Sequence, residues 1–193
     1  MSQSKLGHFM EGFVAATQLL QRARENGFLV EFVCLAASVI DGALRIALIL
    51  QHQLQTGSAA ILDDLLYQSD EDRIIPERVI YKRALEHGVI DQTLFDQLEN
   101  LYAKRNQVMH RYIISDITTK QVFEIAREFE QIIPVISGVA RRLEDEQIQR
   151  GVGMTQSGPS QDRAFNFDDM SAKKHADSSL AYGFRKKQPS RRL

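Results

Sequence analysis

Cysteine, proline and tryptophan are scarce in this sequence: the 193 residues include one cysteine, four prolines and no tryptophan. The single thiol, Cys34, excludes a disulfide within the chain and leaves no cysteine cluster for a metal. Because Cys34 lies in an apolar stretch, we expect it to be buried and unreactive. The N-terminal residues also lack the basic segment and apolar run of a secretory signal. We therefore expect a soluble, cytoplasmic protein without a metal or other cofactor.

An excess of charge of one sign is also absent from the chain as a whole, which has a formal net charge of −1. The charge is nevertheless unevenly distributed. Residues 151–193 contain eight Lys and Arg against four Asp and Glu, a net charge of +4, which leaves −5 for residues 1–150. An acidic body argues against indiscriminate nucleic-acid binding, but it is compatible with a local cationic cleft that includes Arg105 and Arg111.

Apolar residues recur at a spacing of three and four along most of residues 1–150, which is typical of amphipathic helices. The pattern predicts helices at about residues 5–25, 28–54, 76–87, 92–114 and 118–149. Asp91 is expected to cap the fourth helix, and Thr118 is an N-cap candidate for the fifth with Gln121 as its capping-box partner. Pro134 should kink the fifth helix rather than end it, because the apolar stripe resumes after the proline. Residues 59–75 are ambiguous, with a short helix expected around Ile61–Tyr67 and an acidic loop after it. We therefore predict an all-α domain in residues 1–150, an up-and-down bundle of about five helices.

From Gly151 onward, small and polar residues dominate, and the apolar residues have no helical period. Such a segment cannot bury enough apolar surface to offset its ordering entropy, so we predict that residues 151–193 form a disordered basic tail. The nine residues after Phe184 carry five cations. They can contact RNA or an acidic partner, but a solvated tail is the simpler interpretation.

One stretch, Phe28–Leu50, is apolar and long enough to span a bilayer. Glu31, Asp41 and Arg45 interrupt it, and each is costly at membrane depth. We therefore interpret it as a central core helix and expect no membrane contact. Asp41 and Arg45 are four residues apart, which favours an ion pair along one helix face. The alternative is that Asp41 reaches a cleft and holds Arg105 or Arg45 there.

A short motif in the fourth predicted helix, Arg-Asn-Gln-Val-Met-His-Arg-Tyr, carries most of the chemistry. It places a guanidinium, an amide, an imidazole and a phenol within about two helical turns. Asn106 and His110 lie on one face, and Arg105 and Tyr112 are nearly eclipsed. A groove lined in this way can hold a phosphate against the guanidinium with a titratable base beside it. Arg and His at this spacing are a weak signal alone, but the adjacent Asn and the following Tyr make it more specific.

The pattern R-N-x-x-x-H, which starts at Arg105, resembles the signature of the HEPN superfamily, and with Tyr112 it looks like the HepT-type branch. The resemblance covers the motif and a compatible helix order over about residues 5–149. It implies a small helical bundle that is typically dimeric and, in many members, a ribonuclease toxin. We therefore expect an endoribonuclease of toxin–antitoxin or defence type.

The residue types suggest how such a protein would cut RNA without a metal, because the 2′-OH beside each phosphodiester is a built-in nucleophile. His110 would act as acid or base, since imidazole titrates near neutral pH. Arg105 would stabilise charge on the phosphate, and Asn106 would orient His110 or bind the substrate. Tyr102 and Arg111 are candidate substrate-binding residues. A two-fold homodimer would bring both an acid and a base into one cleft, as the resemblance also implies.

A separate role for Tyr112 comes only from the resemblance. In HepT-like proteins the tyrosine of the motif is adenylylated by a partner nucleotidyltransferase, which silences the toxin. The resemblance implies this modification at Tyr112 and a cognate antitoxin of that type. A nucleotide at Tyr112 would place a negative phosphate about two turns from Arg105 and fill the substrate groove.

Two less specific interpretations of the motif stay open. The motif can be an exposed helix face without a function. Alternatively, the bundle can be a non-catalytic module that binds a protein or nucleic-acid partner. His52 and His87 lie close to predicted helix C-termini, where the helix dipole favours a histidine, so we assign them a structural role. The acidic residues at positions 63–72 lack the glycine and terminal glutamate of a calcium loop and predict a solvated loop.

Overall fold

The computed structural model describes residues 2–66, 72 and 74–155. This part of the chain contains helices and turns and no strand, which confirms the predicted all-α class. A short 3-10 helix, η1 (Asp63–Leu65), lies between the second and third α-helices. The α-helices are α1 (Ser2–Asn26), α2 (Leu29–Thr56), α3 (Glu77–Glu86), α4 (Gln92–Arg111) and α5 (Thr119–Arg150). The expected basic tail lies, from residue 156 onward, outside the described residues.

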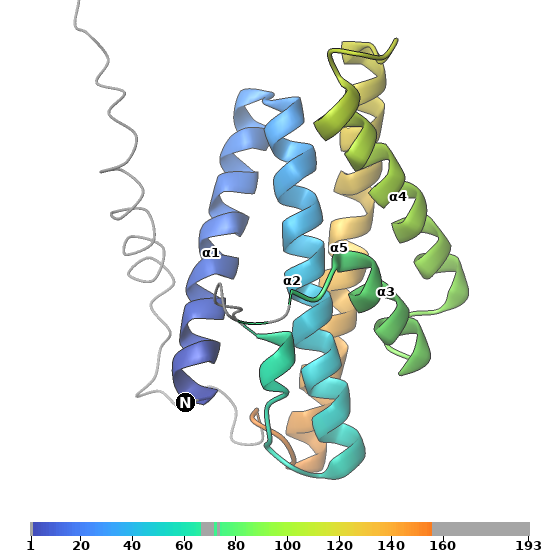
Figure 1. The fold of residues 1–193 in the computed structure, drawn as a ribbon. Helices are drawn as coiled ribbons and strands as arrows, with labels where there is room; N and C mark the ends of the chain where they lie inside the picture. Colours follow the sequence, from blue (N-terminus) through green and yellow to red (C-terminus); the bar gives the residue numbers. More distant parts are fainter. Residues whose placement is uncertain (1, 67–71, 73, 156–193) are drawn as a thin grey trace, which may run out of the picture.

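The helices form an up-and-down bundle around α2 (Figure 1). Two antiparallel pairs, α1 with α2 and α4 with α5, have their connecting turns at the same end of the bundle, which we call the turn end. α2 packs against the other four α-helices, and the short α3 packs against α2 and α4. The motif helix α4 therefore has α3 on one side, α5 on another and α2 behind it.

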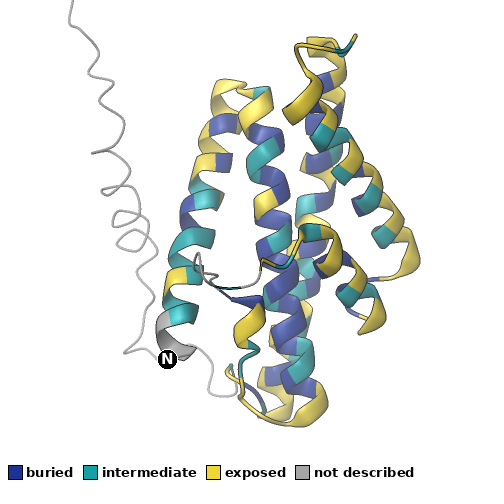
Figure 2. Ribbon diagram, viewed as in Figure 1, coloured by how far each residue is buried: buried dark blue, intermediate teal, exposed yellow. Residues whose placement is uncertain are grey.

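α2 is the apolar centre of the core, and most of its residues are buried (Figure 2). It is the one helix within the described ranges that is long and apolar enough to cross a membrane, and 72% of its apolar window is buried inside the bundle. This burial supports the interpretation of α2 as a core helix. α1 approaches α2 closely at Gly42, where an added Cβ atom would lie 2.7 Å from the Phe13 ring.

α5 begins at the predicted capping box. The Thr118 hydroxyl accepts a hydrogen bond from the Gln121 backbone N–H, and the Gln121 side chain accepts one from the Thr118 backbone N–H at 2.7 Å. The helix then continues past Pro134 to Arg150, as the apolar stripe on both sides of the proline predicts.

Two fully buried glutamines close the end of the bundle opposite the turn end. The Gln147 amide donates to the Gln53 side-chain oxygen at 2.9 Å and to a backbone carbonyl of α2, while the Gln53 amide donates to two carbonyls of the loop after α2. In return, the oxygens of Gln53 and Gln147 accept hydrogen bonds from Met154 and Thr155. In this glutamine cluster, residues 151–155 are bonded to the bundle, although their composition assigns them to the disordered tail.

Two predicted helices differ from the structure. The helix expected around Ile61–Tyr67 is reduced to η1, and Tyr67 lies outside the described residues. α4 ends at Arg111 instead of near residue 114, because the Ser115 hydroxyl and the Ile114 backbone N–H both donate to the Arg111 carbonyl, at 2.7 and 3.1 Å. The residues after Tyr112 consequently leave the helix.

Candidate functional site

α4 carries the motif toward the turn end of the bundle (Figure 1). The helix starts as predicted, with the Asp91 carboxylate accepting from the Leu94 backbone N–H at 2.8 Å. Leu98, Leu101 and Val108 are buried and fix the rotation of α4 against the core. The last turn of α4 and the turn that follows it are largely exposed (Figure 2).

Arg105 is held against α3 rather than extended into solvent, and 22% of its side chain is exposed. Its Nη2 group donates to the carboxylate of Glu77. Its guanidinium carbon lies 5.0 Å from the centre of the Tyr102 ring, within the range of a cation–π interaction. Its Nε–H group is buried and has no acceptor in the described part of the chain. Arg105 is thus a partly buried cation whose hydrogen-bonding edge is only half used.

Glu77, the first residue of α3, has 14% of its side chain exposed. One carboxylate oxygen accepts from Arg105, and the other accepts from the hydroxyl of Tyr81, which is only 2% exposed. Burial raises the pKa of Glu77 above its ordinary value of 4.5, and the Tyr81 hydrogen bond and the Arg105 charge oppose that shift. Burial also raises the pKa of Tyr81, which keeps the phenol a donor. The Glu77 carboxylate is therefore fixed in place from both sides.

Asp41 forms the predicted ion pair with Arg45, whose Nε donates to it at 2.7 Å. Arg45 is buried and also donates to the backbone carbonyls of Leu65 and Ile75, at 3.3 and 3.0 Å. Burial raises the pKa of Asp41 in spite of the Arg45 charge. The structure therefore shows the ion pair along one helix face, and Glu77, not Asp41, pairs with Arg105.

We refer to Asp41, Arg45, Glu77 and Arg105 as the ion-pair cluster. Its charges balance, because two carboxylates face two guanidiniums. Its hydrogen bonds do not balance, since the Asp41 Oδ1 atom and the Arg105 Nε–H group are both buried without a partner within the described ranges. Unsatisfied buried polar atoms are rare in folded proteins, and a pair of them beside a predicted anion-binding arginine marks this region as a candidate ligand site.

Tyr102, a candidate substrate-binding residue, is already occupied by protein groups. The guanidinium carbon of Arg78 lies 5.7 Å from its ring centre, and that of Arg105 lies 5.0 Å away. Arg78 on α3 pairs with Glu99 on α4, which mirrors the pairing of Arg105 on α4 with Glu77 on α3. Tyr102 is half-buried between these two interhelical ion pairs and serves as their common platform.

Asn106 is half-buried, whereas His110 and Arg111 are exposed in the last turn of α4. Because successive residues of an α-helix advance by about 100°, Arg105 and His110 project about 140° apart around the axis. Within the described residues, no hydrogen bond or ion pair joins Arg105 to Asn106 or His110. Arg105 and His110, which were predicted to act together, therefore point in widely different directions from one helix and do not contact each other in a single chain.

Tyr112 directly follows α4 and keeps helical backbone angles, so it lies near Arg105 around the helix as predicted. Its side chain is 41% exposed. The phenol oxygen lies 3.4 Å from the Thr119 hydroxyl at the start of α5, a contact in which either group can donate. The hydroxyl thus lies at the turn end, on a partly exposed residue.

Large apolar side chains are exposed around the motif at the turn end. Ile113 and Ile114 are 95% and 80% exposed, and Met109 and Phe123 are each nearly half exposed. We call these four residues the apolar patch. Scattered exposed apolar residues are ordinary, but two consecutive and almost fully exposed isoleucines are less so, and large exposed apolar patches often mark interaction sites.

Cys34 of α2 lies directly behind this patch, where its thiol contacts the sulfur of Met109. It is half-buried, and burial raises the pKa of the thiol. The expected full burial of Cys34 is therefore not observed, although the raised pKa disfavours the reactive thiolate.

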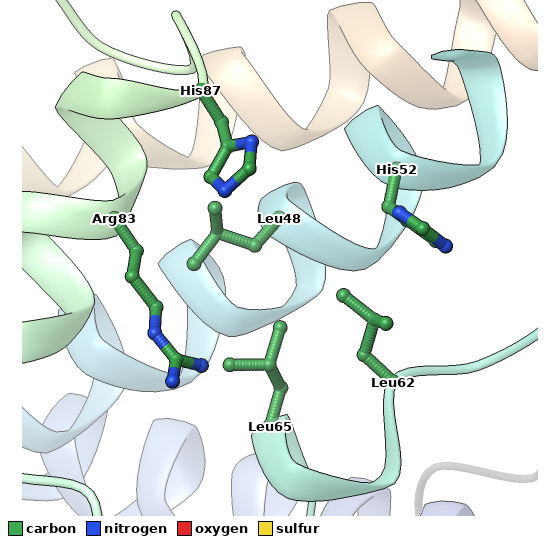
Figure 3. Close-up of a pocket in the computed structure, with 6 residues that line it drawn as sticks. All are labelled: Leu48, His52, Leu62, Leu65, Arg83 and His87. Atoms are coloured by element: carbon green, nitrogen blue, oxygen red, sulfur yellow. The ribbon is translucent and has the colours of Figure 1, made fainter. Parts of the chain in front are cut away.

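A small pocket of about 100 Å³ lies away from the motif, between α2, η1 and α3 (Figure 3). Three leucines form much of its lining, and Arg83, which also lines it, pairs with Asp64 at 2.8 Å. His52 and His87 reach its edge from α2 and α3. His52 lies four residues before the end of α2 and His87 caps α3, so both are close to helix C-termini as predicted.

The chain matches no protein-family model, no curated protein and no solved structure. The site therefore has to be judged from its own residues. Sequence reasoning found the motif but missed Glu77, Tyr81, Arg78 and Glu99, which surround Arg105 and Tyr102. Glu77 lies 28 positions before Arg105, and only the packing of α3 on α4 brings the two together.

Proposed function

We propose that this protein is a metal-independent endoribonuclease of toxin–antitoxin or defence type, with a composite site formed between two copies of the chain. The observation that carries the proposal is the surface around the end of α4. There an exposed imidazole and a partly exposed tyrosine lie within two helical turns of an arginine with an unused donor, next to the exposed Ile113 and Ile114. The resemblance of the motif to HepT-type proteins supplies the reaction.

In this mechanism a neutral His110 removes the proton from a 2′-OH group, and the 2′-oxygen attacks the adjacent phosphorus. The bond between phosphorus and the 5′-oxygen breaks, and a protonated His110 from the second copy donates its proton to that oxygen. The products are a 2′,3′-cyclic phosphate and a 5′-OH end. Arg105 stabilises the charge that builds up on the phosphate, and Asn106 and Arg111 contact the substrate.

A second copy is needed because one chain supplies one motif histidine, and Arg105 and His110 diverge around α4. A two-fold axis through the apolar patch would place the last turns of two α4 helices opposite each other. Burial of Ile113 and Ile114 would favour this association, since each apolar Å² removed from water contributes about 25 cal/mol. The cleft between the copies would then contain two imidazoles and two guanidiniums.

Control of the nuclease would act through Tyr112. A partner nucleotidyltransferase would join the phenol oxygen to the α-phosphorus of a nucleoside triphosphate, with loss of the phenolic proton and release of pyrophosphate. The added phosphodiester would sit near Arg105 and block the cleft. Intact mass after co-expression with a neighbouring nucleotidyltransferase gene is expected to rise by one nucleotide and to stay unchanged in Tyr112→Phe.

The experiment that tests the nuclease is induction of the chain in growing cells, followed by cleavage of labelled RNA in the presence of a chelator. Growth arrest and cleavage are expected from the native protein. Both should be lost in Arg105→Ala and in His110→Ala. Arrest that persists in both variants would contradict the proposed site.

A non-catalytic interaction module is the second candidate, and one observation favours it. In a single chain Arg105 is neutralised by Glu77, and it makes no contact with His110. A module of this kind would bind RNA or a protein through the turn end without cleaving it. Binding of RNA with no cleavage by highly purified protein would support the module.

A further inference from the structure

We propose that the Glu77 carboxylate is an internal competitor for the anion that Arg105 binds, so that Glu77 sets the affinity of this site for phosphate groups. The inference deepens the proposed function, on which it rests, by assigning a regulatory residue outside the motif. It follows from the way in which α3 is packed against α4.

The contact between Glu77 and Arg105 occupies the position that a phosphate oxygen would take. Carboxylates and phosphates bind a guanidinium through the same N–H groups and with similar geometry. Glu77 comes from a different helix, and its side chain is 14% exposed, so the pair is shielded from water better than an ordinary surface ion pair. An incoming phosphate therefore has to displace a carboxylate rather than water.

The side chain of Glu77 is also restrained in the position in which it pairs with Arg105. It starts α3 directly after Pro76, and its second oxygen accepts from the buried Tyr81 hydroxyl one turn later. A carboxylate restrained in this way loses little conformational entropy when it pairs with Arg105. The restraint makes Glu77 a stronger competitor than a flexible surface glutamate would be.

The pairing nevertheless leaves Arg105 incompletely satisfied. Glu77 accepts from Nη2, while the neighbouring Nε–H group is buried without an acceptor in the described part of the chain. A phosphate offers several oxygens and can accept from Nε and Nη2 together once Glu77 is displaced and this edge of the guanidinium turns toward solvent. The arginine thus keeps a donor that its internal partner does not use and that a tetrahedral anion would use. This difference allows a phosphate to displace Glu77.

The chain contains a matched control for this inference. Glu99 on α4 pairs with Arg78 on α3, across the same helix interface and against the same Tyr102 ring. Substitution of either glutamate by glutamine removes one negative charge and keeps the side-chain shape. Glu77→Gln frees Arg105, whereas Glu99→Gln frees Arg78, which lies outside the motif.

The test is a titration of the full chain with sulfate, followed through the Nε–H resonance of Arg105 in ¹⁵N-labelled protein and assigned with Arg105→Lys. We expect Glu77→Gln to bind sulfate at Arg105 about tenfold more tightly than the native chain, which corresponds to one charge-assisted hydrogen bond. Glu99→Gln should bind within about twofold of the native chain, because it changes only the long-range field. Helical circular dichroism verifies folding, and Glu77→Asp, which retracts the carboxylate, serves if Glu77→Gln does not fold.

RNA cleavage measured on the same variants separates this inference from the nuclease proposal. Tighter sulfate binding in Glu77→Gln alone supports the competitor role. If, in addition, no variant cleaves RNA, only the proposed nuclease activity is contradicted. Unchanged or weaker sulfate binding in Glu77→Gln overturns the competitor role, even if the native protein cleaves RNA. Equal tightening in Glu77→Gln and Glu99→Gln overturns it as well, because net charge alone would then account for the effect.

Discussion

The glutamine cluster and the ion-pair cluster are both buried polar groups, but they differ in how completely their hydrogen bonds are made. Gln53 and Gln147 are 0% exposed, and their amides and oxygens bond to each other, to α2 and to two loops. The ion-pair cluster leaves an oxygen of Asp41 and the Nε–H of Arg105 without partners in the described part of the chain. A satisfied network holds a fold together, whereas an unsatisfied one beside a surface is suited to a ligand.

The ion-pair cluster itself consists of two halves that bond to different groups. Asp41 and Arg45 join α2 to the connector before α3 through backbone carbonyls, so this half is structural. Glu77 and Arg105 bond only to side chains and lie nearer the motif. Variants in the two halves should therefore affect different properties.

The largest effect on stability is expected from Arg45→Met. This change leaves the Asp41 carboxylate buried without its partner and two carbonyls without a donor, which should lower the free energy of unfolding by about 3–5 kcal/mol. Urea denaturation followed by circular dichroism measures it. The control is Arg83→Met, which breaks the exposed pair with Asp64 and should cost less than about 1 kcal/mol. Equal losses in the two variants would show that Arg45 is not a structural centre.

The next largest effect is expected from Gln147→Leu. Leucine has a similar size but leaves Thr155 and a carbonyl of α2 without their hydrogen-bond partner. The free energy of unfolding should therefore fall by about 1–3 kcal/mol. Gln92→Leu, on the exposed start of α4, should change stability by no more than about 0.5 kcal/mol. An unchanged free energy of unfolding in Gln147→Leu would mean that the hydrogen bonds of the glutamine cluster do not contribute to stability.

The turn end is expected to control association. Ile113→Glu places a charge in the apolar patch and should raise the dissociation constant of the dimer about tenfold or more, since burial of an unpaired carboxylate is unfavourable. Sedimentation equilibrium measures it. Ile148→Glu changes a 42% exposed isoleucine near the C-terminal end of α5 and should leave the constant unchanged. A native chain that is monomeric at high concentration would contradict the proposed composite site between two copies.

The smallest effect is a pH dependence of anion binding. Because the pKa of Glu77 is raised, acidification through that value neutralises its carboxylate before an ordinary glutamate would titrate. Sulfate should then bind Arg105 more tightly at low pH, by up to about tenfold. Binding to Glu77→Gln should be nearly flat over the same range.

Other groups around Arg105 are taken into account in that measurement. Asp41 also has a raised pKa, so its protonation contributes in the same direction, whereas the raised pKa of Tyr81 keeps its phenol protonated. The measurement is made in the His110→Ala background, which lacks the motif imidazole. A native profile as flat as that of Glu77→Gln would contradict a titrating competitor.

The sequence predicts the bundle well because its helices are long and strongly patterned. The Asp91 cap, the Thr118 capping box and the passage of α5 through Pro134 all follow from local chemistry, and the structure bears them out. The early end of α4 was missed, since it depends on two local hydrogen bonds to the Arg111 carbonyl, from the Ser115 hydroxyl and the Ile114 backbone N–H. Local signals of this kind are short, and competing ones differ by little free energy.

The candidate site is less predictable than the fold. The motif is contiguous and visible in the sequence, but the partners of Arg105 come from tertiary packing. Glu77 follows a proline at a helix start and looks like any acidic first-turn residue. Nothing in the spacing distinguishes it from Glu99, which pairs with an arginine outside the motif. Only the structure shows which of the two glutamates neutralises Arg105.

The most direct test of the nuclease proposal compares two histidines of the same chain. Cleavage of labelled RNA in the presence of a chelator is measured for the native protein, for His110→Ala and for His87→Ala, which removes an exposed histidine at the end of α3. The predicted result is a loss of about 10²–10⁴-fold in His110→Ala, the usual contribution of acid–base catalysis, with native cleavage in His87→Ala. Native cleavage by His110→Ala would contradict the proposal.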